Sequence, residues 1–172
     1  MNRLWQIVFR AAYLLAHGYW FVARPSTKGA YVAVWVNDRV LVIRNSYKRV
    51  FSLPAGGVDR SETFRAAAAR ELCEEVGVCI AETDLTEFGT YQCFEEYKHD
   101  TTVVFELQLD CEPTLSPDNR EVVCAEFADL DEVQQLPLSE TLRKYLIDAM
   151  AQRSQRCPDS VSTSQFADAC PR

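Results

Sequence analysis

Residues 53–78 form the sequence LPAGGVDRSETFRAAAARELCEEVGV, in which a glycine-containing loop is followed by a stretch rich in alanine and glutamate. Both of these residue types favour helix. Ser61 carries a side chain suited to an N-cap, and Gly77 suits a left-handed helix stop. We therefore predict a loop and then a helix that runs from near Ser61 to about Val76, with Glu62 in its first turn.

Three glutamates of this helix are expected on one face, because Glu71, Glu74 and Glu75 are spaced i, i+3 and i+4. Clustered carboxylates repel one another, and a hard divalent cation with oxygen ligands removes that repulsion. Arg70, next to the first acid, can hold a carboxylate by a bidentate contact. The alternative is a solvated acidic helix face, which composition alone favours. The glycine loop at a fixed distance before the acids favours a metal site instead.

The spacing of these residues resembles the Nudix box of the Nudix hydrolases. Gly56, five residues, Glu62, seven residues and then RELCEEVGV match the box at every fixed position. The box covers Gly56 to Val78, and a looser resemblance extends over about residues 29–147. The resemblance implies an α/β fold, the Nudix-type α/β/α sandwich with a mixed β-sheet. It also implies an enzyme that cleaves a phosphoanhydride bond in a nucleoside diphosphate linked to another moiety.

The resemblance assigns the metal site and the catalytic groups to the box. Glu74 and Glu75 are expected to hold Mg²⁺ or Mn²⁺, with a backbone carbonyl around Ala55 as a further ligand. Glu71, oriented by Arg70, is expected to be the general base or an additional metal ligand. A metal held in this way bridges the phosphates and lowers the pKa of a bound water.

Other acids have expected roles around this centre. Glu62 is expected to be an outer-shell or structural acid, and Gly56 to belong to the loop backbone beside the metal. A further acid from outside the box often completes the metal site in this family, and we rank Glu121 first for that role. The acids that compete with it are Glu95, Glu96 and Glu106.

The composition is that of one globular domain, with 172 residues of which 48% are hydrophobic and 25% charged. The formal net charge of −7 argues against a broad nucleic-acid-binding surface, which would be basic. It allows one small nucleotide-type diphosphate held through a metal. No residue is assigned to substrate binding, and a homodimer stays open.

The seven cysteines form no CxxC pair and show no zinc-like spacing with the two histidines. An odd, scattered set in a chain of this size predicts reduced, mostly buried thiols in a cytoplasmic protein. Cys73 lies inside the predicted metal-binding helix, but at a variable position of the box, and it receives no role.

Residues 2–22 (NRLWQIVFRAAYLLAHGYWFV) are apolar and aromatic, with Arg3 and Arg10 among them. Arg10 interrupts the apolar run and no clear small-residue cleavage site follows, so a signal peptide is not expected. The run is also too short and too charged for a membrane span. Two alternatives remain: an amphipathic helix that packs on the domain or on a partner subunit, or one that lies on a membrane surface. We favour packing, which makes residues 1–24 an extra N-terminal helix.

The rest of the chain alternates between β-rich and helical segments. The expected strands are residues 31–36, 39–43, 51–53, 86–96, 101–109 and 121–127. Asn37-Asp38 predicts a hairpin between the first two strands. The expected helices after the box are a short turn at 129–135 and a last helix from Glu140 to about Gln152, capped by Ser139. The Nudix domain is therefore expected at residues 25–153 and a disordered tail at 154–172.

The leading hypothesis for function is a Mg²⁺-dependent nucleotide pyrophosphohydrolase. One alternative is a non-catalytic nucleotide-binding or regulatory module on the same scaffold, because a fold does not fix a function. The intact acids of the box argue against that module. The other alternative, suggested only by residues 1–22, is a membrane-peripheral enzyme that acts on a lipid- or sugar-linked diphosphate.

Several downstream side chains are weak candidates for contact with the substrate. A base could stack on Trp35, Phe94 or Tyr97, although core packing is the commoner fate of such aromatic residues. His99 could be a substrate-side acid or base, but a lone loop histidine is more often an ordinary surface residue.

Overall fold

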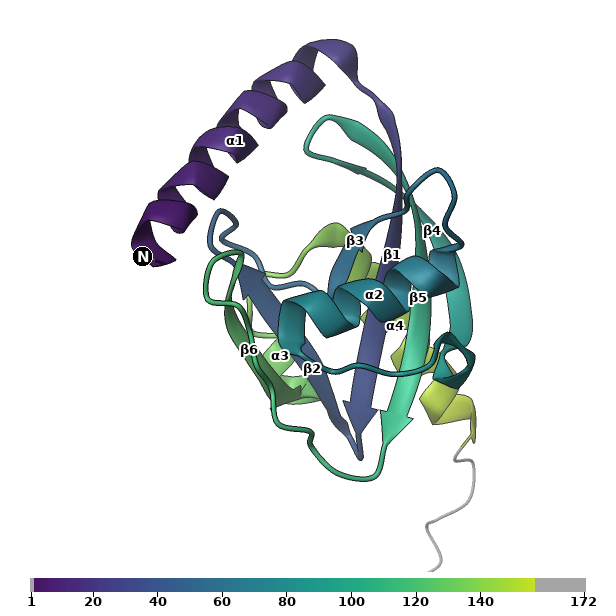
Figure 1. The fold of residues 1–172 in the computed structure, drawn as a ribbon. Coiled ribbons are helices and arrows are strands. Elements are labelled where there is room, and N and C mark those ends of the chain that lie inside the picture. The colour runs from purple at the N-terminus through teal and green to yellow at the C-terminus, as the bar shows by residue number, and fades with distance from the viewer. Residues whose placement is uncertain (1, 157–172) are drawn as a thin grey trace, which may run out of the picture.

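The computed structural model describes residues 2–156 (Figure 1). In chain order, its elements are α1 (Asn2–Ala23), β1 (Ser26–Val36), β2 (Arg39–Asn45), β3 (Ala55–Gly57), α2 (Phe64–Val76), a 3-10 turn η1 (Glu82–Asp84), β4 (Thr86–Glu95), β5 (Lys98–Leu109), β6 (Val122–Asp129), α3 (Leu130–Val133) and α4 (Glu140–Arg156). Because α4 reaches Arg156, the predicted tail overlaps the helix at 154–156. The rest of the predicted tail, residues 157–172, lies outside the described residues.

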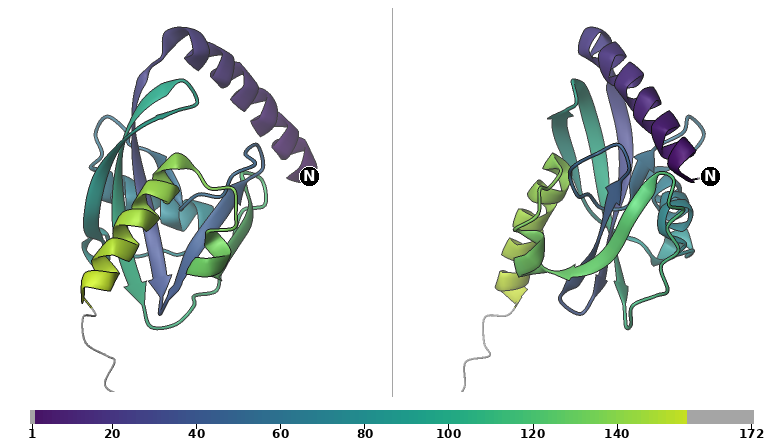
Figure 2. Two further views of the ribbon diagram at one scale, coloured as in Figure 1. Left: turned by 180° about the vertical axis from the view of Figure 1, so that it is seen from behind. Right: turned by 90° about the vertical axis from the view of Figure 1, so that its left-hand side faces the viewer.

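The strand β1 is the centre of a mixed sheet with the order β4-β5-β1-β2-β6, and β3 also pairs with β1. β1 runs parallel to β5, with Ser26 opposite His99 and Val36 opposite Leu109. The other pairings among the described strands are antiparallel. The helix α2 covers one face of the sheet and α4 covers the other (Figures 1 and 2). The predicted α/β/α sandwich with a mixed sheet and an extra N-terminal helix is confirmed.

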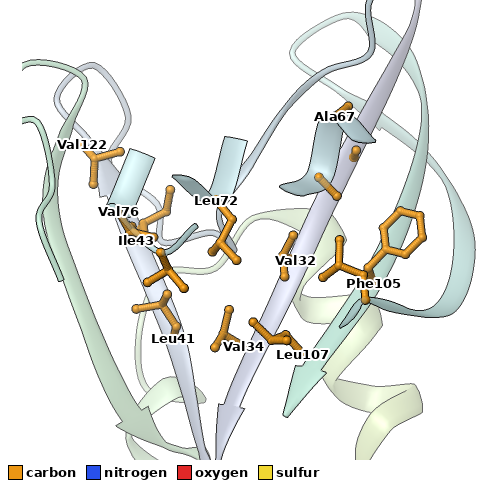
Figure 3. Packing of buried hydrophobic residues seen from close by; sticks show 14 of the residues in the cluster. Val32, Val34, Leu41, Ile43, Ala67, Leu72, Val76, Phe105, Leu107 and Val122 are labelled. Carbon is orange, nitrogen blue, oxygen red and sulfur yellow. The ribbon is translucent and has the colours of Figure 1, made fainter. Parts of the chain in front are cut away.

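Neighbouring residues of β1 enter two separate hydrophobic clusters, one on each face of the sheet. Val32 packs in the same cluster as Leu72 of α2 (Figure 3). Trp35 packs in the other cluster with Tyr145 of α4, and its indole N–H donates to the Tyr145 hydroxyl at 2.7 Å. Successive side chains of a strand point to opposite faces, so a strand covered on both sides is a continuous apolar run. This packing fixes α2, and with it the acids of the motif, against the sheet.

The ends of α2 differ from the prediction at one side only. The N-cap is Thr63 rather than Ser61, because the Thr63 hydroxyl accepts from the Ala66 N–H at 3.0 Å. Glu62 therefore precedes the helix instead of lying in its first turn, and its own N–H closes a turn on Asp59. At the other end the predicted stop is confirmed, since Gly77 has φ 76° and its N–H bonds back to the last turn.

The Thr63→Ala variant is expected to lose about 1 kcal/mol of folding stability, because the N-cap hydrogen bond to the first turn of α2 disappears. In a domain of this size that loss corresponds to a decrease of about 2–4 °C in melting temperature. Ser61→Ala is the matched control and should change the melting temperature by much less. Equal effects of the two changes in thermal melts would contradict the assignment of the cap.

The hairpin between β1 and β2 is confirmed, with Val36 paired to Arg39 and Asn37 in the left-handed region at φ 54°. The predicted strand at 51–53 is wrong. Phe51 and Ser52 make only isolated bridges, and the strand that pairs with β1 is β3, two residues later. Pro54 separates the two segments, and it has no N–H with which to continue a ladder.

The prediction that all cysteines are reduced is wrong for one pair, because Cys73 and Cys79 form a disulfide. The left-handed cap at Gly77 turns the chain back on itself, so the Cα atoms of the two cysteines lie 4.4 Å apart. Three further cysteines of the described chain are free, Cys93, Cys111 and Cys124. The remaining two lie beyond residue 156.

The helix α1 contacts the domain through one face, at the loop after β2 and at the hairpin of β4 and β5 (Figure 2). The packing that we favour for residues 1–24 over a membrane surface stays a prediction. Phe9 and Tyr13 lie against the Tyr47 ring, with centroids 6.5 and 5.0 Å away. The Tyr13 hydroxyl donates to Glu96 at 2.9 Å, and Arg10 Nε donates to the Ser46 carbonyl at 3.0 Å. None of the helices within residues 2–156 combines the length and the apolarity needed to span a bilayer.

Candidate active site

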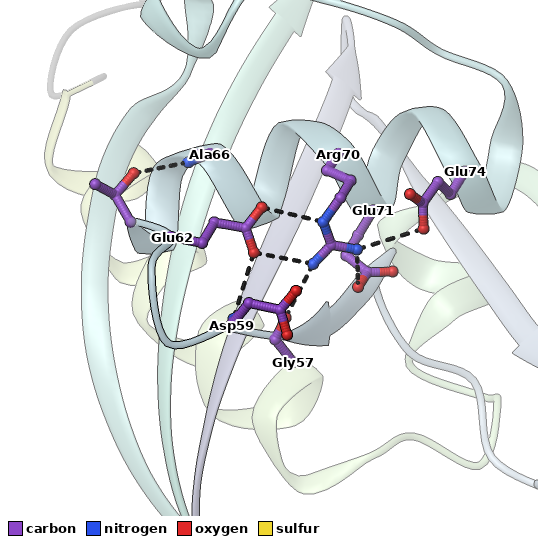
Figure 4. A network of polar contacts seen from close by, with 8 residues as sticks. Gly57, Asp59, Glu62, Ala66, Arg70, Glu71 and Glu74 are labelled. Atoms are coloured by element: carbon purple, nitrogen blue, oxygen red, sulfur yellow. Dashed lines mark hydrogen bonds and ion pairs between the residues drawn. The ribbon is translucent and has the colours of Figure 1, made fainter.

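Arg70 is the centre of a polar network beside α2 (Figure 4). Its Nε and Nη2 donate to the two carboxylate oxygens of Glu62 at 3.0 and 3.1 Å. Its Nη1 donates to Glu71 at 2.6 Å and to Glu74 at 3.3 Å. Its Nη2 also donates to the Gly57 carbonyl at 3.1 Å. One guanidinium therefore joins the loop to three acids of the motif, and its hydrogen bonds with Glu62 and then Glu71 raise the pKa of Arg70.

Glu62 lies before α2 and holds the loop rather than a helix face. Besides Arg70, its carboxylate accepts from the Asp59 N–H at 3.4 Å. The hydrogen bond from Arg70 lowers the pKa of Glu62, so this carboxylate stays ionised. Its contacts within residues 59–70 support the structural role that we expect for it.

Glu71 lies directly against the glycine loop. A Cβ atom on Gly56 would lie 1.9 Å from the Glu71 Oε1, so only glycine leaves room for this carboxylate. Burial raises the pKa of Glu71, and the hydrogen bond from Arg70 opposes that shift. Position 56 is therefore a glycine because the Glu71 carboxylate occupies the space that a side chain would need.

Glu75 is the most deeply placed acid of the motif, with 8% of its surface exposed. The Ala55 N–H donates to its Oε2 at 2.8 Å. Burial, followed by the negative charges of Glu71 and Glu121, raises the pKa of Glu75 to about 8. The contact between Ala55 and this acid runs through the amide, whereas the expected metal contact through the Ala55 carbonyl stays a proposal.

Glu121 comes to this cluster from the start of β6, as the preferred acid from outside the motif. The Ser46 N–H donates to the Glu121 carbonyl at 2.7 Å, which sets the backbone beside the end of β2. The Tyr47 hydroxyl then donates to the Glu121 carboxylate at 2.7 Å, and burial with this neighbouring charge raises the pKa of Tyr47. The charge of Glu121 in turn raises the pKa of both Glu71 and Glu75. Glu121 therefore acts electrostatically on both of these acids of the motif.

The donor set fits a divalent cation by its chemistry. The negative charge of Glu121 raises the pKa of both Glu71 and Glu75, so it disfavours their ionised forms, and a bound cation reverses that effect. The side chains do not yet form a complete coordination shell. Within residues 2–156, no group of three or more Asp, Glu, His or Cys side chains lies close enough together to hold a metal ion. The Glu74 side chain is 61% exposed and turned to Arg70, so it would have to rotate to join the cluster.

The other candidates lie elsewhere. Glu106 accepts a hydrogen bond from Tyr145, the residue of α4 that packs on the far face of the sheet, and Glu96 pairs with Lys48 at 3.1 Å. His99 is exposed and packs on the Phe94 ring. Trp35 lies in the core, and Tyr97 packs on the rings of His17 and Phe21 of α1. Of Glu95, only the backbone at the end of β4 is described.

A cleft of about 730 Å³ opens beside the glycine loop, between β1, the hairpin of β4 and β5, and the start of α2. Its basic side chains are Lys28, Lys48, Arg60 and Lys98. Sequence reasoning missed these residues, because they come from separate loops and strands and have no fixed spacing. The pairing of β1 with β5 brings part of the cleft wall together, since Thr27 lies opposite Asp100 and both residues line the cleft.

A smaller hollow of about 320 Å³ separates α1 from the domain. It is lined by aromatic rings of Tyr13 and Trp20 from α1 and by Tyr47. Lys48 and Lys98 line both this hollow and the cleft. The helix α1 therefore stands beside the candidate active site, and its Tyr13 and Trp20 contact the residues that shape it.

Solved structures with the same fold are numerous. A MutT/nudix family protein from Enterococcus faecalis is 17% identical over 60% of this chain, with a TM-score of 0.55; the chain spans 44% of that protein. A bifunctional NMN adenylyltransferase/ADP ribose pyrophosphatase from Francisella tularensis, complexed with AMP and a Mn ion, is 16% identical over 84% of this chain, which spans 48% of it (TM-score 0.66). An Ap4A hydrolase from C. elegans is 18% identical over 75% of this chain and 98% of its own length (TM-score 0.63).

Among curated proteins none matches the chain. A family model, described as the NUDIX domain, matches residues 25–149. This match covers most of the chain and includes the glycine loop, Arg70 and every acid of the cluster. The chain belongs to the NUDIX domain family, as the spacing of residues 56–78 predicts.

Proposed function

We propose that the protein hydrolyses a phosphoanhydride bond in a nucleoside diphosphate linked to another moiety, with Mg²⁺ or Mn²⁺ as cofactor. The observation that carries the proposal is the position of two acids against the glycine loop, with Glu71 facing Gly56 and Glu75 accepting from the Ala55 N–H. The same loop lines a cleft that contains four basic side chains. Hydrolysis at phosphorus needs neutralised phosphate oxygens and a positioned water. This part of the molecule offers groups for both tasks.

The residues that would hold the cofactor are Glu71, Glu74, Glu75 and the Ala55 carbonyl, with Glu121 as the acid from outside the motif. When bound there, a divalent cation would neutralise the phosphates and lower the pKa of a coordinated water. In this proposal Glu71, which accepts a hydrogen bond from Arg70 at 2.6 Å, would accept the proton of the attacking water. Arg70 also fixes the loop through the Gly57 carbonyl, which keeps the acid and the loop in one rigid arrangement.

The cleft is lined by four basic and three acidic side chains, and the basic ones support a substrate that carries negative charge. Lys28 and Arg60 are exposed at its lining, and Lys48 and Lys98 are held there by ion pairs with Glu96. Cationic side chains at this position suit the phosphates beyond the scissile bond. Two of the structural neighbours, an ADP ribose pyrophosphatase and an Ap4A hydrolase, are named for diphosphate-containing substrates that differ in the attached group. The attached group is therefore best identified by experiment.

A substrate panel identifies this group. Nucleoside diphosphate sugars, dinucleoside polyphosphates and nucleoside triphosphates are incubated with the full chain and Mg²⁺ or Mn²⁺, and the products are identified by mass. We expect cleavage of a phosphoanhydride bond to leave a nucleotide product. Binding of these nucleotides without turnover of any of them would instead support the non-catalytic module.

The activity is expected to disappear in excess chelator and to return when Mg²⁺ or Mn²⁺ is added back, because a divalent cation is needed to neutralise the phosphates and to lower the pKa of the attacking water. The control is Ca²⁺ at the same concentration. It restores the ionic strength, but it binds oxygen ligands at longer distances and in a more flexible geometry, so we expect it to restore less activity. Turnover that persists after chelation would contradict the assignment of the glutamates as metal ligands.

A further inference from the structure

The helix α1 presents an apolar stripe to the outside, opposite the face that packs on the domain. This outer stripe consists of Leu4, Ile7, Val8, Leu14, Leu15 and Val22, all exposed. The spacing of these residues follows the helical repeat, so they form one continuous band along the helix. Leu15 is 77% exposed and Val22 is 81% exposed, although buried leucine and valine are the rule in a folded domain. A band of this length marks a surface that another phase or molecule covers.

The charges around the outer stripe are all positive. Arg3 and Arg24 are exposed on or just after α1, and the first 24 residues contain no acid. Arg10 lies at the side of the helix nearer the domain, where its Nε donates to the Ser46 carbonyl. Arg120 adds a further cation at one end, where its guanidinium lies 5.7 Å from the Trp5 ring centroid. All 25 acidic residues of the chain lie beyond residue 24. The helix is therefore a cationic, apolar edge on a protein whose net charge is −7.

We propose that the outer stripe docks α1 on a bilayer that contains anionic lipid headgroups. A helix with an apolar face and flanking arginines lies in the interface plane, with apolar side chains among the acyl chains and cations among the headgroups. Tyr19 and Phe21, both exposed near the end of α1, suit the level of the headgroups. The proposal concerns where the protein works, and it does not depend on the proposed reaction.

The charge pattern disfavours a second copy of the chain as the occupant. Pairing two outer stripes face to face would place the arginines of one α1 beside those of the other, with no acid on either helix to neutralise them. The packed face of α1 is already occupied, since Phe9, Tyr13 and Trp20 contact Tyr47 and Lys98 of the domain. An anionic bilayer satisfies both the apolar side chains and the arginines at once.

Vesicle flotation with the full chain tests this surface. Vesicles of phosphatidylcholine alone and of phosphatidylcholine with phosphatidylglycerol are compared with and without added salt. The altered protein carries Ile7→Asp and Leu15→Asp, which place two negative charges in the outer stripe. The matched control is Ile147→Asp on α4, because Ile147 and Ile7 are 63% and 62% exposed. Melting temperatures of all three proteins show that each is folded.

We expect the unaltered chain to float with the anionic vesicles, to bind neutral vesicles less, and to lose binding as salt rises. Ile7→Asp with Leu15→Asp should lower the bound fraction by roughly tenfold or more, whereas Ile147→Asp should not. Failure to float, or flotation unaffected by the two aspartates, overturns the proposal. A concentration-dependent dimer that the two aspartates dissociate, without vesicle binding, overturns it in favour of a second copy.

Discussion

The Glu75→Gln variant is expected to lose hydrolysis by about two to three orders of magnitude while keeping its fold. Glu75 is almost fully buried, and its pKa of about 8 means that the metal-free protein already holds this side chain largely in its neutral form at pH 7. Glutamine has the same shape as that neutral acid, and its carbonyl oxygen can still accept from the Ala55 N–H. The melting temperature without metal should therefore change little, and the loss should fall on metal binding.

Thermal melts with and without Mg²⁺ separate the two effects. A ligand that binds only the folded state stabilises it by about 2.7 kcal/mol at a hundredfold excess over its Kd. The unaltered protein should show such a shift and Glu75→Gln should not. The control is Glu87→Gln, an exposed acid on β4 away from the cluster, which should keep both the shift and the activity. A full metal shift in Glu75→Gln would place the cation elsewhere.

The same melts decide the role of Glu74. If Glu74 is a metal ligand, the Glu74→Gln variant should not show the Mg²⁺-induced shift in melting temperature, as we expect for Glu75→Gln. In the metal-free structure its exposed side chain only contacts Arg70, at 3.3 Å. If Glu74→Gln keeps the shift, Glu74 is not needed as a ligand, and Glu71, Glu75 and Glu121 are the remaining candidates.

Local patterns predicted the parts of the molecule that depend on local physics. The i, i+3, i+4 spacing placed the acids on α2, and the glycine stop predicted its end at Gly77. The apolar run at residues 31–36 predicted a strand. It did not show that both faces of the strand are buried, because a continuous apolar run has no period of two. The N-cap was misplaced by two residues, since Ser61 and Thr63 are both suitable caps and only the turn closed on Asp59 selects between them.

Of the parts that the sequence did not predict, one is local and the others depend on distant residues. The pairing of Cys73 with Cys79 follows from the direction of the chain after the helix cap, which cysteine spacing alone does not show. The cleft beside the glycine loop combines Lys28, Lys48 and Lys98 from separate segments of the chain. Glu121 ranks first as the acid from outside the box only because such an acid is common in the family. Its position beside Tyr47 results from the pairing of β2 with β6.

The Gly56→Ala variant is expected to lose most of its activity, roughly a hundredfold or more, through the position of Glu71. A Cβ at this position would lie 1.9 and 2.5 Å from the two Glu71 carboxylate oxygens, far inside contact distance. The clash involves the end of a flexible side chain, so Glu71 can rotate away and the fold survives. The displaced carboxylate then gives up its hydrogen bond with Arg70 and its place in the acid cluster.

Gly57→Ala provides the matched comparison for this effect, because a Cβ at Gly57 meets no atom within 4 Å. Both changes remove the same backbone freedom from β3 and add the same methyl group, so their difference reports the contact with Glu71 alone. We expect Gly57→Ala to keep the Mg²⁺-induced shift in melting temperature and Gly56→Ala to lose most of it. The double variant Gly56→Ala with Glu71→Gln should be no worse than either single change, because both act on one carboxylate. Additive losses in kcat/KM would show instead that Gly56 contributes through the loop backbone and not through Glu71.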